Sequence, residues 1–152
     1  MIQFRIISIL SALVVSGCVF TQPSGPHGAE RAQLNSARQL WKAQALDDYT
    51  YVFSRGCFCV FEYREPVTIT VRGGNIISVV SVASGSPRDA SSYQTLEALF
   101  DIILNAIDKN AATIRAEYHP TRGHVTTAYI DMDQRIADEE ISFEAKSLTP
   151  LR

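Results

Sequence analysis

Apolar residues recur along the chain at two different periods, and each period predicts a different secondary structure. In two segments they follow one another at spacings of three and four, which is the period of one helix face. The first covers residues 30–46 and ends before two aspartates; the second begins at Thr95, a good N-cap residue, and reaches about residue 109. The stripes are Leu34, Ala37, Trp41 and Ala45 in the first, and Leu96, Leu99, Phe100, Ile103 and Ile107 in the second. We expect both stripes, including Trp41, to pack into the core.

Other segments are rich in aromatic and β-branched residues or alternate between apolar and polar positions, which predicts strands. In residues 66–72, Val67, Ile69 and Val71 share one face and polar side chains share the other. The turn residues 73–75 connect this strand to a returning one, and residues 120–123 separate two later strands in the same way. The candidate strand segments are residues 49–53, 58–63, 66–72, 76–83, 113–119, 125–131 and 141–148, from which about three strands are expected on each side of the second helix.

The order of these elements indicates the fold class. Short hairpin connections pair strands antiparallel. The sequence therefore predicts an α+β fold in the order α-β-β-β-α-β-β-β. We expect an antiparallel sheet of about five or six strands with two helices packed on one face. A single domain over residues 30–152 is long enough to bury one core without metal or disulfide staples.

The N-terminal segment is organised like a secretion signal. Arg5 supplies positive charge, and residues 6–15 form an apolar run that is shorter than the ~20 residues needed to span a bilayer. Residues 15–18 read Val-Ser-Gly-Cys and resemble the lipobox of bacterial lipoproteins, in which the cysteine carries a diacylglyceryl group and a peptidase cuts before it. We therefore expect residues 1–17 to be a lipoprotein signal peptide and Cys18 to be the lipidated first residue of the mature chain.

A lipid on Cys18 has consequences for location. Each buried CH₂ contributes about 0.8 kcal/mol, so two or three acyl chains hold a protein firmly to a membrane. Residues 18–29 contain prolines and glycines and are expected to form a flexible tether. Val19 stands where an Asp would resemble an inner-membrane retention signal. The expected location is the bacterial cell envelope, at the outer membrane facing the periplasm.

Composition narrows the function classes. The 152 residues are 46% hydrophobic and 20% charged, with a formal net charge of -2. These values are typical of a globular protein and exclude a disordered chain, a coiled-coil rod and a polytopic membrane protein. Nucleic acid is not an expected partner, because a general nucleic-acid binder needs a basic face to displace counterions.

Several motifs together resemble a known family. They are Trp41, Asp48-Tyr49-Thr50-Tyr51, Arg55-Gly56-Cys57-Phe58-Cys59, residues 66–74, residues 95–100, Tyr118-His119-Pro120-Thr121-Arg122-Gly123, and the closing Ile130-Asp131 and residues 135–141. Across about residues 41–148 the chain resembles the bacterial domain-of-unknown-function family numbered sixty-one seventy-four, which consists of small secreted proteins and lipoproteins. The resemblance implies no activity. The chain departs from the family at residues 123–125, Gly-His-Val, where the family often has Gly-Tyr-Pro.

With Cys18 assigned to lipid, Cys57 and Cys59 form an even pair. Residues two apart in an extended strand have Cα atoms about 6.6–6.8 Å apart, at the upper limit for a disulfide, so a bond between them needs a turn or bulge that Gly56 permits. A structural disulfide in the oxidising envelope is one interpretation. The alternatives are a Zn or Cu(I) site completed by His119 or His124, thiol-redox exchange, or buried free thiols.

The remaining polar residues indicate no enzyme class. The acidic residues between 131 and 140 do not match the EF-hand pattern, because Arg135 takes the fifth position and no glycine follows it. We expect this segment to be a solvated turn, and the alternative is a loose Ca²⁺ site. His119 and His124 flank a turn and are expected to be exposed. No nucleophile elbow, phosphate loop or zinc-protease motif is present.

These observations favour a function without catalysis. We expect an anchored module that binds an envelope protein or peptide without a cofactor. The alternative is a metal-binding or thiol-redox protein that uses the Cys57-x-Cys59 pair.

Overall fold

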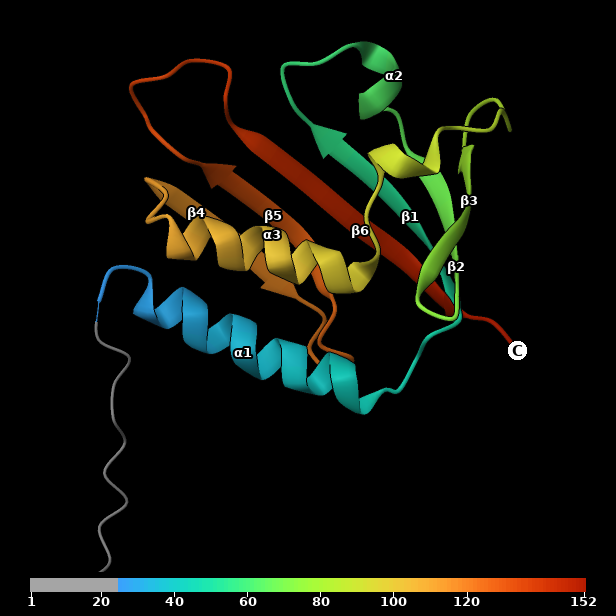
Figure 1. Cartoon of the computed structure of the whole chain (residues 1–152), viewed down its shortest axis with the longest axis horizontal. Helices are drawn as coiled ribbons and strands as arrows, with labels where there is room; N and C mark the ends of the chain where they lie inside the picture. The colour runs from blue at the N-terminus through green and yellow to red at the C-terminus, as the bar shows by residue number, and fades with distance from the viewer. Residues whose placement is uncertain (1–24) are drawn as a thin grey trace, which may run out of the picture.

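The computed structural model describes residues 25–152, which form one antiparallel sheet with two helices on one face (Figure 1). The predicted signal peptide, Cys18 and most of the predicted tether lie outside the described residues. The long helices are α1 (Gly28–Ala43) and α3 (Leu96–Asp108). The strands are β1 (Tyr49–Gly56), β2 (Val67–Arg72), β3 (Asn75–Ser81), β4 (Thr113–Tyr118), β5 (Val125–Asp131) and β6 (Ile141–Pro150). Two short helical elements are α2 (Phe61–Arg64) and the 3₁₀ turn η1 (Ala90–Ser92). The predicted fold class is confirmed.

The strand order is β3-β2-β1-β6-β5-β4, and each neighbouring pair is antiparallel. Two hairpins, β2–β3 and β4–β5, form the outer parts of the sheet, as the two turn sequences predict. The central pair joins β1 from the first half of the chain to β6 at its end. The last strand therefore ties the two halves of the domain together.

The helices follow their predicted stripes, although α1 begins at Gly28, inside the predicted tether of residues 18–29, and ends earlier than predicted. Thr95 caps α3, because its side-chain oxygen accepts from the backbone N–H of Ala98 at 3.3 Å. The first helix was expected to reach residue 46 and instead ends at Ala43. Ala45 has a φ of 47°, a left-handed conformation that stops a helix, and it is exposed rather than part of the core stripe.

The predicted strand over residues 58–63 is wrong. In the structure the chain turns at residues 57–59 and then forms the short helix α2. Cys57 and Cys59 are bonded as a disulfide with their Cα atoms 5.3 Å apart, which is shorter than extended backbone allows for residues two apart. The disulfide and a strand are therefore incompatible here, and aromatic composition alone did not reveal the conflict.

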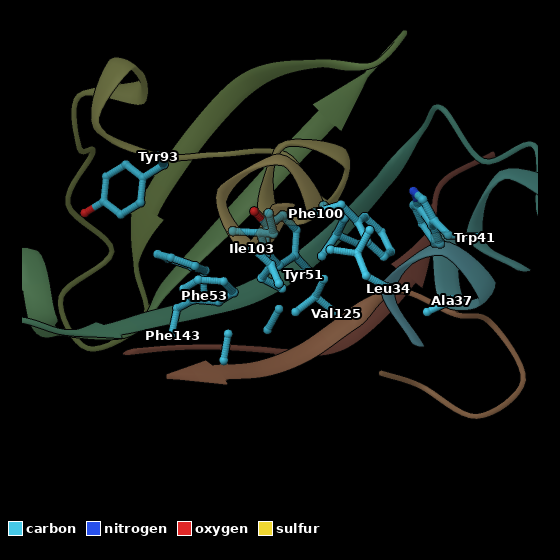
Figure 2. Packing of buried hydrophobic residues seen from close by; sticks show 14 of the residues in the cluster. Leu34, Ala37, Trp41, Tyr51, Phe53, Tyr93, Phe100, Ile103, Val125 and Phe143 are labelled. Atoms are coloured by element: carbon cyan, nitrogen blue, oxygen red, sulfur yellow. The ribbon is translucent and has the colours of Figure 1, made fainter. Parts of the chain in front are cut away.

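The core fills the space between the helices and the sheet (Figure 2). Trp41 is buried there, as predicted, with its edge against Tyr49. The carboxylate of Glu97 accepts from Trp41 Nε1 at 2.8 Å and from the Tyr49 hydroxyl at 2.7 Å. The Tyr49 oxygen in turn accepts from the backbone N–H of Leu96 at 3.1 Å. This network connects α1, β1 and the start of α3 and satisfies the polar groups that the core encloses.

Candidate functional site

Two regions of the described chain combine solvent access with unusual side chains, and they lie at opposite ends of the sheet. The first is the disulfide loop, which we define as residues 57–64 between β1 and β2. The second is the histidine cleft, defined below, where β5 and β6 separate. Each contains residues that the sequence singles out, Cys57 and Cys59 in one and His119 and His124 in the other.

The disulfide loop presents apolar side chains to solvent. Phe58 is 82% exposed, Val60 is 64% exposed and Phe61 is 72% exposed. The guanidinium of Arg64 lies 5.9 Å from the centre of the Phe61 ring. The disulfide joins the residues on either side of Phe58, so it fixes the turn that holds this ring away from the domain. Sequence reasoning missed this surface, because a strand would have buried alternate side chains of the same segment.

The loop between β5 and β6, residues 132–140, lies at the same end of the sheet (Figure 1). Gly56 pairs with Ser142, which places the start of β6 beside the disulfide loop. This second loop adds the exposed Ile136 and an excess of acidic side chains. Those acidic groups do not assemble a cation site, because Asp133 forms an ion pair with Arg135 at 2.6 Å and Glu139 accepts from the Asp133 backbone N–H.

Two arginine clusters support the base of the disulfide loop. The guanidinium of Arg55 lies 5.3 Å from the ring centre of Phe53 and 5.1 Å from that of Tyr93, and it donates to the Ser92 carbonyl. Arg88 forms an ion pair with Glu65, and this pair holds the pKa of the Glu65 carboxyl below its usual value. Such partly buried, multiply bonded arginines fix the backbone on which the loop stands.

The histidine cleft is a cavity of about 420 Å³ at the opposite end of the sheet. β5 and β6 are paired from the point where Ile130 lies opposite Ile141 to the point where Thr127 lies opposite Glu144, and their pairing stops there. Beyond that point β6 contains one extra residue relative to β1, since Val52 pairs with Lys146 whereas Thr50 pairs with Thr149. Ser147 has a φ of 57° in this bulge. The cleft is lined by Glu117, His119, Arg122, His124, Thr126, Thr127, Glu144, Ala145, Lys146, Ser147 and Leu148.

His119 and His124 come together in the cleft, with their ring centres 4.9 Å apart and nearly parallel. The expectation that both are exposed is wrong for His124, which is only 3% exposed because its ring packs edge-on against Trp41 of α1. Burial, with the nearby His119 and Arg122, lowers the pKa of His124 to about 4. His124 is therefore neutral at pH 7, and its Nδ1 is buried with no hydrogen-bond partner among the described residues.

Gly123 holds the turn that carries both histidines. Its backbone N–H donates to the His119 carbonyl at 2.8 Å, and the His119 N–H donates to the His124 carbonyl at 2.8 Å. Gly123 also packs directly on α1: a Cβ atom at this position would lie 2.2 Å from the Ala37 carbonyl oxygen. Only glycine fits at this contact, and the contact brings His124 against Trp41.

The structure does not bring the histidines to the cysteines, as a shared metal site would require. Cys57 follows the end of β1 that pairs with Ser142, whereas His119 and His124 lie beside residues 144–148 at the other end of β6. Within residues 25–152 no group of three or more His, Cys, Asp or Glu side chains is arranged to hold a metal ion. The disulfide also leaves Cys57 and Cys59 without the thiolates that Zn or Cu(I) would bind.

Comparison with known proteins agrees with the sequence resemblance. No curated protein and no solved structure matches the chain. In the part of the chain that the structure describes, no helix is long and apolar enough to cross a bilayer. A family profile described as "Family of unknown function (DUF6174)" matches residues 33–150, which span α1 to the end of β6. The chain therefore belongs to the DUF6174 family of unknown function.

Proposed function

We propose that this protein is a lipid-anchored component of the bacterial cell envelope that binds a protein partner through the disulfide loop, without catalysis. The anchor rests on the Val-Ser-Gly-Cys motif at residues 15–18, and the expected location is the outer membrane, facing the periplasm. The binding role rests on one observation, the exposure of Phe58, Val60 and Phe61.

In the isolated domain these apolar side chains are exposed to water, which is unfavourable, and binding to a partner would bury them. Apolar surface is stabilised by about 25 cal/mol for each Å² removed from water, and large aromatic residues supply most of the binding energy at interfaces. Neighbouring exposed apolar groups that are rimmed by polar residues mark interaction sites. Glu62 and Arg64 supply such a rim within the loop itself.

Charge around the loop favours a protein over an anionic lipid surface. Residues 131–140 contain five carboxylates, Asp131, Asp133, Asp138, Glu139 and Glu140, against one arginine, Arg135. Anionic headgroups would be repelled by this surface. The complementary partner is a protein with an apolar pocket and a basic rim, since opposite potentials across an interface speed association and exclude wrong partners.

The binding test compares two exposed apolar sites on the same domain. In the envelope of its own host, the full chain is crosslinked and recovered as wild type, as Phe58→Ser/Phe61→Ser, and as Ile77→Ser. Ile77 is 61% exposed but belongs to β3, so it is the matched control. We expect a partner that the wild type and Ile77→Ser capture equally and that the loop variant loses. Equal capture by all three would refute the assignment of binding to this loop.

The anchor is tested separately. Replacing Cys18 with Ser removes the only thiol that the lipobox places for acylation, so the chain should move from the membrane fraction to the soluble periplasmic fraction. An intact mass of the wild-type chain should show cleavage before Cys18 and the added acyl groups. A Cys18→Ser chain that stays in the membrane fraction would refute lipid anchoring through this residue.

A second candidate function uses the same loop for thiol exchange. Its motivation is that Cys57 and Cys59 are bonded yet partly exposed. A partner dithiol would reduce the bond to two thiols and itself become a disulfide. Cys57→Ser/Cys59→Ser separates the two functions. Thiol exchange predicts that Cys59→Ser alone traps a mixed disulfide between Cys57 and the partner, and that this species is absent from the double variant. The binding function predicts no mixed disulfide in either variant.

A further inference from the structure

We propose that the histidine cleft binds a small zwitterionic ligand, a free amino acid or short peptide that carries both a carboxylate and an ammonium group. The cleft lies at the end of β6 opposite the disulfide loop, so this inference is independent of the proposed docking function.

The two histidines offer hydrogen-bond donors of fixed orientation. His119 Nδ1 accepts from the backbone N–H of Arg122 at 3.2 Å, which leaves Nε2 as the nitrogen of this ring that can donate to a ligand. His124 Nδ1 is buried with no hydrogen-bond partner in residues 25–152, so Nε2 is the nitrogen of this ring that a ligand in the cleft can reach. The two rings stack with their centres 4.9 Å apart, so the Nε2 atoms of both rings can contribute donors to one bound carboxylate.

Arg122 adds positive charge to the same group. One of its Nη atoms donates to the Leu148 carbonyl at 3.3 Å, which holds the side chain across the gap between the strands. No carboxylate among the described residues forms an ion pair with Arg122. The rest of its guanidinium is free to bind an anion, and arginine does so in bidentate geometry.

The cleft also carries negative charge, which selects against a simple anion. Glu117 and Glu144 line it together with Lys146. Glu144 forms an ion pair with Lys146 at 2.9 Å, whereas Glu117 has no cationic partner among the described residues. A purely anionic ligand would place negative charge beside the Glu117 carboxylate. A purely cationic ligand would place positive charge beside the Arg122 guanidinium. A zwitterion satisfies both groups.

Size and rigidity fit this ligand class. A cavity of about 420 Å³ is within the range of small-molecule sites, roughly 300–1,000 Å³. The turn that carries the donors is clamped by its own backbone hydrogen bonds and by the contact of Gly123 with α1. A site built on packed elements loses little entropy when the ligand binds.

The test uses the full chain and glycylglycine as the probe, with binding followed by calorimetry and by backbone amide chemical shifts. We expect a Kd of about 1 mM or tighter, with shifts confined to residues 117–127 and 144–148. N-acetylglycylglycine, which lacks the ammonium group, and glycylglycinamide, which lacks the carboxylate, should each bind at least about tenfold more weakly. Absence of glycylglycine binding, equal affinity for the blocked peptides, or shifts elsewhere on the domain would each overturn the proposal.

Two arginine variants keep the test specific. Arg122→Gln should lose affinity for glycylglycine and lose the preference for the free carboxylate over the amide. Arg115→Gln is the matched control, because Arg115 belongs to neighbouring β4 but stacks on Tyr129 at 5.7 Å rather than lining the cleft. Unchanged binding in Arg122→Gln, or an equal loss in both folded variants, would refute the role of the cleft. Loss of partner capture by Phe58→Ser/Phe61→Ser affects none of these results.

Discussion

Gly123→Ala is the sharpest test of how the histidine turn is held. The added Cβ would lie 2.2 Å from the Ala37 carbonyl oxygen, 2.6 Å from Leu40 Cβ and 2.7 Å from the backbone nitrogen of Trp41, and all three atoms belong to α1. Forcing such a group into a packed contact costs about 1–3 kcal/mol. Gly123 also has a φ of +79°, where a non-glycine residue costs about 1–2 kcal/mol more. The expected loss in free energy of unfolding is therefore about 2–5 kcal/mol.

Gly74→Ala separates the two contributions. Gly74 has nearly the same φ, +73°, but nothing lies within 4 Å of its added Cβ. It should lose only the conformational part, about 1–2 kcal/mol. Both variants are measured by equilibrium urea unfolding, followed by the fluorescence of Trp41, the single tryptophan. An equal loss in both would refute the close packing of Gly123 on α1, and with it the explanation for the burial of His124.

Three further predictions concern the core network, His124 and the disulfide. Tyr49→Phe leaves the buried Leu96 N–H without its acceptor and should cost about 1–3 kcal/mol in urea unfolding, whereas Tyr63→Phe, on the exposed loop, should stay within about 0.5 kcal/mol. Since the pKa of His124 falls from 6.5 to about 4 on folding, the unfolded chain binds more protons between these values; unfolding titrations should show stability decreasing as pH falls through this window, and His124→Phe should flatten that decrease. Cys57→Ser/Cys59→Ser opens a loop of only three residues, so thermal melts should show a stability loss below about 2 kcal/mol, and a larger loss would mean that the bond supports the core.

Local sequence patterns predict most of the fold because the interactions that produce them are local. The stripe from Leu96 to Ile107 and the alternation from Val67 to Val71 each report one buried face, and the structure buries those faces. The prediction was wrong for residues 58–63, where aromatic residues are as compatible with an exposed loop as with a strand. The bond between Cys57 and Cys59 decides the outcome there, because it needs the turn that the spacing of the two cysteines already indicated, and that turn excludes a strand.

The candidate site was less predictable, because long-range contacts create it. His119 and His124 are visible in the sequence, but the burial of His124 depends on Trp41, more than eighty positions earlier. The opening between β5 and β6 depends on the bulge at Ser147 and on the register of β6 against β1. Neither has a signature in a single sequence. Gly123 was visible only as a turn residue, although its contact with α1 is what places the histidines.

Strand β6 separates the two proposed surfaces and makes them mechanically independent. Its first residues pair with Gly56 beside the disulfide loop, and residues 144–148 line the histidine cleft. The six residue-to-residue steps of strand from Ser142 to Leu148 span about 20 Å. Between these ends β6 pairs with β1, pairs with β5 as far as Glu144, and packs against the core through Phe143 and Ala145. Substitutions that far apart without shared contacts have additive effects, so a ligand in the cleft is not expected to alter docking at the loop. If both proposals hold, the domain acts as a rigid spacer between the two proposed binding surfaces and not as a switch.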